Sequence, residues 1–222
     1  MFALSFVTLA AASVARAATY SVSDTFIGSS FLNGFTHEAI ADPTHGRVNY
    51  VDQTTAQRLN LTYASGNTFV LRSDYTATLN PSGAGRNSVR IQSKKQWSTH
   101  VEILDVRHMP QGCGSWPAYW TTNTANWPAA GEIDIIEGVN DQAPNAATLH
   151  TTAGCTQPFT PRPPPPTATG KSTATRDAVS KTPSPTRTVH HSTPTAEDDY
   201  VNNNPAAFKN AYWDIAALRV YQ

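Results

Sequence analysis

Three closely spaced carboxylates lie in an otherwise apolar segment, and they are the residues of this sequence best suited to acid–base chemistry. Residues 131–138 read Gly-Glu-Ile-Asp-Ile-Ile-Glu-Gly, with carboxylates at Glu132, Asp134 and Glu137. The apolar and β-branched neighbours predict a strand, and charged side chains in such a strand are costly unless they face a cleft. On a regular strand Glu132 and Asp134 point to one side and Glu137 points to the other.

One additional residue in this strand would bring all three carboxylates to one face. A β-bulge in which Ile135 and Ile136 share one pleat step corrects the parity at Glu137. The two outer carboxylates would then lie about 5–5.5 Å apart, the separation typical of retaining glycosidases. One would act as nucleophile and the other as general acid, with Asp134 orienting the nucleophile. A solvated acidic edge and a calcium site are the alternative interpretations, and the apolar interior of the segment argues against the edge.

The elements that must position these carboxylates are predicted to be strands. Residues 89–93 and 100–106 are alternating or β-branched runs. Strong turn formers separate them at residues 80–85 and 109–112. From residue 20 to about residue 152 no segment shows sustained apolar spacing at helical period, so this part of the chain predicts an all-β sandwich.

The N-terminus predicts export. Residues 2–14 are apolar and small, and Ala15-Arg16-Ala17 forms an A-x-A cleavage pattern. We expect a signal peptide over residues 1–17 and a secreted, extracellular mature chain, with a buried first helix as the alternative. Export makes the sequon at Asn60 a candidate N-glycan site. It also allows a disulfide between Cys113 and Cys155.

The overall charge gives no reason to expect nucleic acid or an anionic membrane as a partner. The chain has 16 basic and 16 acidic residues, and 14% of its residues are charged. A neutral carbohydrate fits this balance. No further apolar run of membrane length follows the N-terminal one, so we expect a soluble protein, most simply a monomer, that needs no metal or other cofactor.

The composition changes sharply after residue 155. Residues 156–197 are rich in Pro, Thr and Ser, with four consecutive prolines at 163–166. Proline has no backbone N–H to donate to a neighbouring strand, and the segment has few large apolar side chains to bury, so it is predicted to be disordered. It is either an O-glycosylated linker or translated intron sequence. Residues 198–222 follow, and the apolar positions at 212–221 predict a last strand that returns to the core of residues 18–155.

The surroundings of the carboxylates resemble glycoside hydrolase family 16, and especially the basidiomycete laminarinase-like endo-β-1,3(4)-glucanases. The resemblance covers residues 25–152 and resumes at 199–222. It rests on long strings, namely Gly-Ser-Trp-Pro-Ala-Tyr-Trp at 114–120, Ala-Asp-Pro-Thr-His-Gly-Arg-Val-Asn-Tyr at 41–50 and Val-Arg-His-Met-Pro-Gln-Gly at 106–112. It implies a concanavalin-like β-jelly-roll sandwich and retaining hydrolysis of β-1,3/1,4-glucan of the laminarin or lichenan type.

The resemblance also implies roles for individual residues. Glu132 is similar to the family nucleophile, Asp134 to the assisting aspartate and Glu137 to the general acid/base. The remaining matched positions imply β-glucan contacts: Trp120 and Trp127 as cleft tryptophans, His150 as a histidine beside the carboxylates, and Arg90 as a sugar-contacting arginine. Each of these four also has an ordinary structural interpretation as a core or strand residue.

The sequence departs from the family after His150, where further strands, cysteines and part of the cleft wall are expected. The Pro/Thr-rich segment stands in their place, so the sandwich is expected to be incomplete, as in an internally truncated relative, and Cys155 to lack its family partner. An inactive β-glucan-binding protein and a product that does not fold are therefore the alternatives to an active hydrolase.

Overall fold

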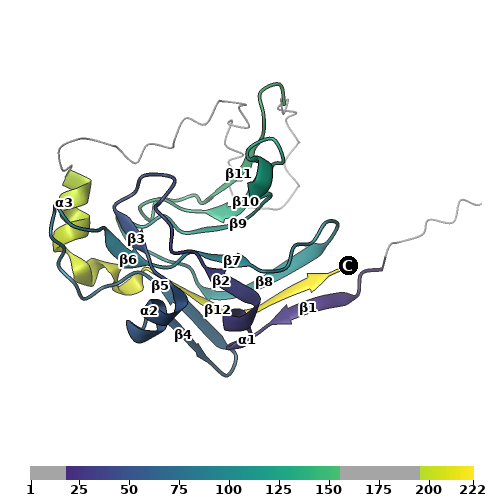
Figure 1. Ribbon diagram of the computed structural model, residues 1–222, viewed down its shortest axis with the longest axis horizontal. Coiled ribbons are helices and arrows are strands. Elements are labelled where there is room, and N and C mark those ends of the chain that lie inside the picture. Colours follow the sequence, from purple (N-terminus) through teal and green to yellow (C-terminus); the bar gives the residue numbers. More distant parts are fainter. Residues whose placement is uncertain (1–18, 156–195) are drawn as a thin grey trace, which may run out of the picture.

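A computed structural model describes residues 19–155 and 196–222 and shows a fold made mainly of β-strands (Figure 1). The prediction of an all-β fold is confirmed. The strands in chain order are β1 (Val22–Phe26), β2 (Phe35–His37), β3 (Val48–Tyr50), β4 (Thr62–Ser65), β5 (Thr68–Arg72), β6 (Arg86–Ser88), β7 (Ile91–Ser93), β8 (Val101–His108), β9 (Ala118–Thr122), β10 (Glu132–Glu137), β11 (Ala146–His150) and β12 (Tyr212–Tyr221). The helices are α1 (Ser30–Gly34), α2 (Gln53–Arg58), α3 (Ala196–Asn203) and the short 3-10 turns η1 (Thr124–Asn126) and η2 (Pro205–Asn210).

β12 organises the larger sheet. It pairs antiparallel with β1, β5 and β8, and β4 extends the sheet beyond β5. The strand predicted over residues 212–221 is therefore present, and it joins the two ends of the described chain in one sheet (Figure 1). Two smaller ladders, antiparallel β2–β7 and parallel β3–β6, complete this part of the molecule.

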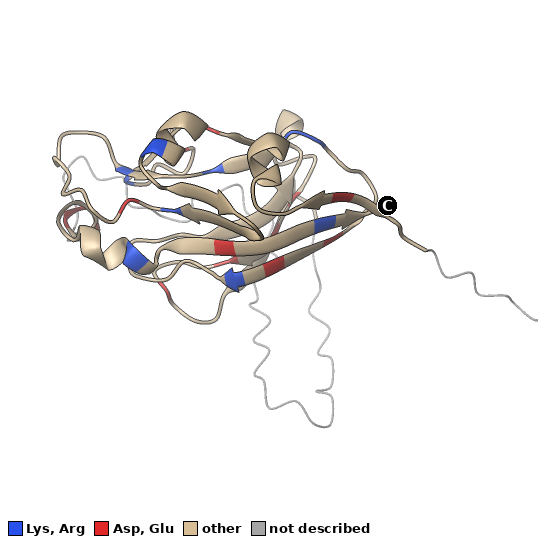
Figure 2. Ribbon diagram, turned by 90° about the horizontal axis from the view of Figure 1, so that it is seen from below, with Lys and Arg blue, Asp and Glu red and all other residues tan. Residues whose placement is uncertain are grey.

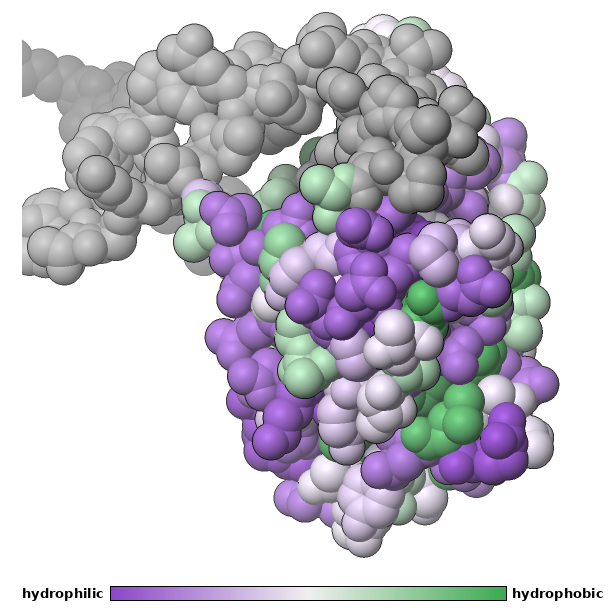
Figure 3. All heavy atoms as spheres, turned by 90° about the vertical axis from the view of Figure 1, so that its left-hand side faces the viewer, coloured by the Kyte–Doolittle hydropathy of each residue, from purple (hydrophilic) through white to green (hydrophobic). Residues whose placement is uncertain are grey.

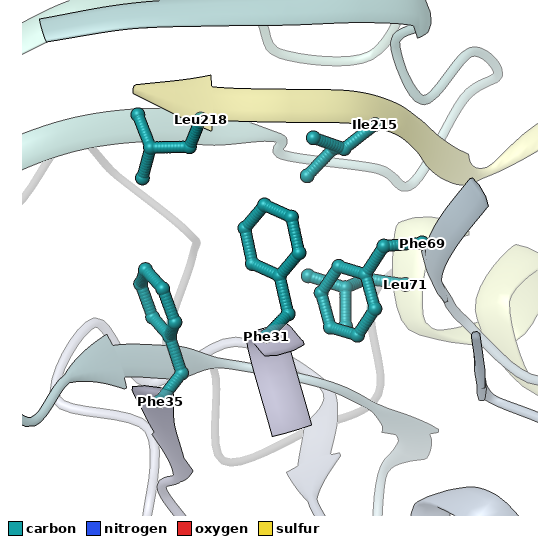
Figure 4. Packing of buried hydrophobic residues seen from close by; sticks show 6 residues of the cluster. All are labelled: Phe31, Phe35, Phe69, Leu71, Ile215 and Leu218. Atoms are coloured by element: carbon teal, nitrogen blue, oxygen red, sulfur yellow. The ribbon is translucent and has the colours of Figure 1, made fainter. Parts of the chain in front are cut away.

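Aromatic packing forms the main core beneath this sheet (Figure 4). Phe31 of α1 and Phe69 of β5 stack with their ring centroids 4.4 Å apart and their planes 3° from parallel. Both are buried, and Ile215 and Leu218 of β12 pack on the same cluster. Because aromatic side chains bury large areas, the short helix α1 acts as an anchor for β5 and β12.

β9, β10 and β11 form a separate three-stranded sheet in the order β11–β10–β9, and it contains the carboxylate segment (Figure 1). On this sheet Ile133, Ile135 and Leu149 are 49%, 41% and 48% exposed, and Ile133 lies opposite Leu149 in the β10–β11 register. Apolar side chains on two neighbouring strands would ordinarily face a core. Among the described residues these apolar side chains instead lie at the surface.

The structure differs from the predicted strands at residues 89–93. β6 ends at Ser88 and β7 begins at Ile91, so Val89 and Arg90 lie between two strands. The reason is a change of partner, because β6 pairs with β3 whereas β7 pairs with β2. The chain leaves one ladder and enters another at these two residues.

Short helices also appear where sequence periodicity gave no signal. α1, α2 and α3 have five, six and eight residues, too few turns for a repeated apolar spacing. The first turn of α3 contains Glu197, Asp198 and Asp199, whose negative charges are favourable near a helix N-terminus. Arg86 fixes this helix from the body of the molecule, because its guanidinium group donates hydrogen bonds to the carbonyl oxygen of Val201.

The proposed disulfide is not formed. Cys113 and Cys155 are both exposed free cysteines in the structure. The predicted signal peptide at 1–17 and almost all of the Pro/Thr-rich segment lie outside the described residues, so both stay predictions. None of the helices in the described ranges is long and apolar enough to cross a membrane.

Charges are dispersed over the described surface. Figure 2 shows acidic and basic residues interspersed along the ribbon, without a large patch of one sign. The face at the left-hand side of Figure 1 is mainly hydrophilic and carries one smaller apolar area (Figure 3). This distribution agrees with the formal charge of zero and gives no electrostatic footprint for a polyanion.

Candidate active site

β10 contains the bulge that the sequence predicts. Against β9, Asp134 lies opposite Trp120 and Ile136 lies opposite Tyr119, so one residue of β10 has no counterpart. The ladder with β11 shows the same additional residue between Asp134 and Glu137. Two residues facing one partner residue define a β-bulge, and the resulting change of parity returns Glu137 toward the side of the other carboxylates.

Asp134 is the most buried member of the carboxylate cluster, with 4% of its surface exposed. The pKa of Asp134 is raised to about 6, first by burial and then by the neighbouring charges of Glu137 and Glu132, while His150 acts in the opposite direction. The charges of both outer carboxylates therefore reach Asp134. A crowded acidic site of this kind favours holding at least one proton near neutral pH.

His150 connects two of the carboxylates. It lies opposite Glu132 in the β10–β11 register. Its Nε2 atom is 2.9 Å from Oδ2 of Asp134, a hydrogen bond, and 3.6 Å from Oε1 of Glu132. The predicted position of this histidine beside the carboxylates is therefore observed, and His150 limits the rotation of Asp134.

Each outer carboxylate accepts a hydrogen bond from a tryptophan. Trp127 Nε1 donates to Oε2 of Glu132 at 3.0 Å. Trp116 Nε1 donates to Oε1 of Glu137 at 2.5 Å. An N–H donor to a carboxylate fixes its orientation. Trp116 was missed as a functional residue, although it lies in the tryptophan-rich string at 114–120, because sequence spacing does not reveal which indole reaches which carboxylate.

Trp120 and Arg90 form a second arrangement next to the carboxylates. Trp120 lies opposite Asp134 on the neighbouring strand, and directly opposed residues share one face of a sheet. The guanidinium carbon of Arg90 lies 4.9 Å from the centroid of the Trp120 ring, a cation–π contact. Arg90 also forms an ion pair with Glu38, with Nε 2.6 Å from Oε2. The predicted sugar contact of Arg90 stays a prediction.

The same cluster offers a set of ligand atoms for a cation. One ligand atom each from Glu132, Asp134 and His150 lie within 4.8 Å of one another. Calcium prefers six to eight oxygen ligands, so two carboxylates and an imidazole nitrogen suit it poorly. Zinc accepts nitrogen and carboxylate ligands, but the hydrogen bonds of His150 and Trp127 already use part of this set. The arrangement is therefore better suited to acid–base chemistry than to a resident metal.

The predicted site residues thus fall into two groups. Glu132, Asp134, Trp127 and His150 are joined by hydrogen bonds or close contacts. Glu137 lies on the same bulged strand and affects the pKa of Asp134. Trp120 and Arg90 contact each other beside this group. Two carboxylates flanking a third, with aromatic rings alongside, provide what acid–base cleavage of a glycosidic bond requires.

Comparison with known families decides the ancestry. The family model described as the XgeA-like, catalytic GH16 domain matches residues 35–191.

The chain belongs to glycoside hydrolase family 16.

Fungal relatives agree with membership in family 16. A probable endo-1,3(4)-β-glucanase of Aspergillus fumigatus is 43% identical over 153 residues, which cover 68% of this chain and 23% of that protein. An endo-1,3(4)-β-glucanase of Arthroderma benhamiae is 43% identical over 142 residues, 64% of this chain and 30% of that protein. This family 16 chain therefore corresponds to less than a third of the length of these relatives.

Solved structures of family 16 proteins have the same fold. A structure of laminarinase 16A from Phanerochaete chrysosporium, with 6-O-glucosyl-laminaritriose in its donor and acceptor sites, has a TM-score of 0.75 and 42% identity and covers 92% of this chain and 100% of the laminarinase. An elongating family 16 β-1,3-glucosyltransferase has a TM-score of 0.69 at 26% identity, again covering 92% of this chain and 100% of the other. The predicted β-jelly-roll class is confirmed by these matches.

Proposed function

We propose that this chain carries a retaining endo-β-glucanase site that cleaves β-1,3/1,4-glucan. The single observation that supports it best is the bulge in β10, which brings Glu137 to the side of Glu132 and Asp134. The similarity to fungal proteins named as endo-1,3(4)-β-glucanases supports the substrate class.

In the first step, the carboxylate of Glu132 attacks the anomeric carbon of the sugar bound on the non-reducing side. The glycosidic C–O bond breaks as Glu137 donates its proton to the departing oxygen, and a glycosyl ester forms on Glu132. In the second step, Glu137 removes a proton from water, and the water oxygen attacks the anomeric carbon. The ester bond breaks, and the two inversions give net retention.

The neighbouring side chains orient the two reacting carboxylates. The Trp127 indole holds one oxygen of Glu132, and the Trp116 indole holds one oxygen of Glu137. The second oxygen of each glutamate is left for the reaction. Asp134, held by His150, lies between them and tunes the charge of the site. Holding reactants in a fixed orientation removes much of the entropic cost of reaction.

We further propose that aromatic stacking holds the glucan. Trp127 is 42% exposed and donates directly to the nucleophile, so its ring lies where the sugar in the first subsite would pass. Trp120, on the carboxylate face, would support a neighbouring glucosyl ring. Aromatic faces pack well against the C–H bonds of sugars. Arg90 beside Trp120 would contact sugar hydroxyl groups.

The setting of this activity is also part of the proposal. A cleaved signal peptide and an N-glycan at Asn60 fit an extracellular, monomeric enzyme that acts on polysaccharide. Asn60 is exposed in the turn between α2 and β4, which leaves its amide accessible.

The experiment is hydrolysis of laminarin and lichenan by the full chain, with reducing ends measured over time and the first-formed anomer followed by NMR. We expect β-configured products and a loss of at least about a thousandfold in kcat for both Glu132→Gln and Glu137→Gln. Asp105→Asn is the matched control, because Asp105 is an exposed carboxylate on β8.

Several results would contradict the proposal. α-Configured products would mean an inverting mechanism. Binding of laminarin by wild-type protein without turnover would identify a β-glucan-binding protein. Products longer than the substrate would instead assign the site to glucosyl transfer, in which a sugar hydroxyl group replaces water in the second step.

A further inference from the structure

Glu38, which lies outside the carboxylate cluster, forms the closest ion pair near the site. Its Oε2 atom is 2.6 Å from Nε of Arg90. The side chains of Arg90 and Glu38 are 22% and 19% exposed, so both are largely removed from water. A charge pair in such surroundings interacts more strongly than one at an open surface.

The backbone holds these two residues in register. His37 lies opposite Ile91 in the β2–β7 ladder. One residue further along, the amide nitrogen of Glu38 donates a 2.9 Å hydrogen bond to the carbonyl oxygen of Arg90. Glu38 and Arg90 are thus joined through both main chain and side chain, although 52 positions separate them in the sequence.

The charges of this pair also act on Tyr50. Burial raises the pKa of Tyr50 to about 12, with the charges of Asp42 and Glu38 acting in the same direction and that of Arg90 acting against them. The hydroxyl of Tyr50 therefore stays neutral at neutral pH. The guanidinium group of Arg90 has its fixed counter-charge in Glu38.

Arg90 links the ion pair to the candidate active site through its contact with Trp120. Its guanidinium carbon lies 4.9 Å from the centroid of the Trp120 ring, and Trp120 lies opposite Asp134 on the next strand. The cation supports the indole from one side. The orientation of an aromatic ring decides how well its face stacks on a sugar. Because the Arg90 guanidinium group contacts both Glu38 and the Trp120 ring, it restricts the orientation of that ring.

We propose that Glu38 is a positioning residue for glucan binding: it fixes Arg90, and Arg90 sets the orientation of Trp120 at the edge of the catalytic strand. The inference rests on the proposed function for its substrate, but the contact between Glu38, Arg90 and Trp120 does not. Because Glu38 touches neither the carboxylates nor the bond that breaks, its effect falls on substrate binding and leaves the chemical step unchanged.

The test is Glu38→Gln in the full chain, which keeps the size of the side chain and removes its charge. We expect KM for laminarin to rise about fivefold, in the range of a single cation–π contact, with kcat within about twofold of wild type. Asp214→Asn is the matched control, because it weakens another Arg–carboxylate pair, Arg107–Asp214 at 2.9 Å, on the larger sheet. This control should change neither constant.

A second readout needs no activity. The indole N–H resonances of the five tryptophans are recorded by NMR, and that of Trp120 is assigned from Trp120→Phe. Glu38→Gln should shift the Trp120 resonance and leave that of Trp97 in place, because Trp97 donates to Asp24 at a different position.

The kinetic and NMR results together distinguish a failure of this inference from a failure of the proposed function. If wild-type protein does not cleave β-glucan but the Trp120 resonance shifts in Glu38→Gln, the proposed activity fails and the positioning role stands. An unchanged resonance, or a fall in kcat at constant KM, overturns the positioning role. The double variant Glu38→Arg/Arg90→Glu restores an ion pair without a cation at Trp120, so recovery of a wild-type KM by it would also overturn the role.

Discussion

The indole nitrogen of Trp127 lies 3.0 Å from Oε2 of Glu132, and its N–H donates a hydrogen bond to that carboxylate. A residue five positions earlier in the chain thus orients the proposed nucleophile. The same ring is 42% exposed, so one side chain serves both the carboxylate and the space where substrate would lie.

Two substitutions of Trp127 should separate these two roles. Trp127→Phe keeps a ring and removes the donor, so kcat should fall more than KM rises. Trp127→Ala removes both, so KM should also rise, by about tenfold. Because the side chain is exposed, the free energy of unfolding should fall by less than about 1 kcal/mol.

Steady-state kinetics and urea unfolding check both variants of Trp127. Trp97→Phe is the control, since Trp97 forms a similar indole–carboxylate hydrogen bond with Asp24 at 2.7 Å. A large loss of stability with unchanged kinetics would make Trp127 a structural residue only.

Azide should rescue the two proposed catalytic glutamates with opposite stereochemistry. On an aryl β-glycoside, whose leaving group needs no proton, Glu132→Ala with azide should yield the α-glycosyl azide, because azide occupies the cavity of the missing nucleophile. Glu137→Ala with azide should yield the β-glycosyl azide through the intact ester on Glu132. NMR of the isolated azides distinguishes them, and an exchanged pattern would mean that the two roles are reversed.

Asp134→Asn should stabilise the fold while harming activity. The pKa of Asp134 is about 6 in the folded protein, against an ordinary value of 3.8. As pH rises through this window the unfolded chain loses the proton first, so the free energy of unfolding falls, by up to about 3 kcal/mol from this group. An uncharged Asn avoids that loss.

Thermal unfolding at pH 4 and pH 7.5 checks this sign for Asp134. We expect Asp134→Asn to raise Tm clearly at pH 7.5 and only slightly at pH 4, where the folded aspartic acid keeps its proton. Asp105→Asn, on an exposed position of β8, should show no such pH-dependent difference. A variant of Asp134 that is less stable at both pH values would show that the hydrogen bond with His150 outweighs the cost of burying the charge.

The exposed apolar face of β10 should tolerate polar substitution. Ile133→Thr should change the free energy of unfolding by less than about 0.5 kcal/mol, because 49% of Ile133 is exposed and threonine suits a strand. Ile215→Thr, at a position that is 6% exposed in the core, should cost several times more, about 2–4 kcal/mol. Urea unfolding measures both. A loss above about 2 kcal/mol at Ile133 would mean that another layer covers this face.

The sequence by itself determined the strand that carries the three carboxylates, its bulge and the last strand of the larger sheet. These features depend on local pattern: three carboxylates within an apolar run require a correction of parity to share a face, and the many apolar positions at 212–221 predict a strand. The jelly-roll class followed from resemblance over long strings of residues. The break between strands at Val89 and Arg90 could not be predicted from the sequence, because a change of ladder partner leaves no mark in side-chain periodicity.

Only the tertiary structure decided which side chains meet. The donor to Glu137 is Trp116, 21 positions away, and the partner of Arg90 is Glu38, 52 positions away. It also showed that Cys113 and Cys155 are not bonded, and that α3 is held by hydrogen bonds from Arg86 together with the packing of Val201 against Phe208. Sequence spacing records which residues share a strand face. Contacts between strands depend on the register and order of the sheets, which are set by the folded chain as a whole.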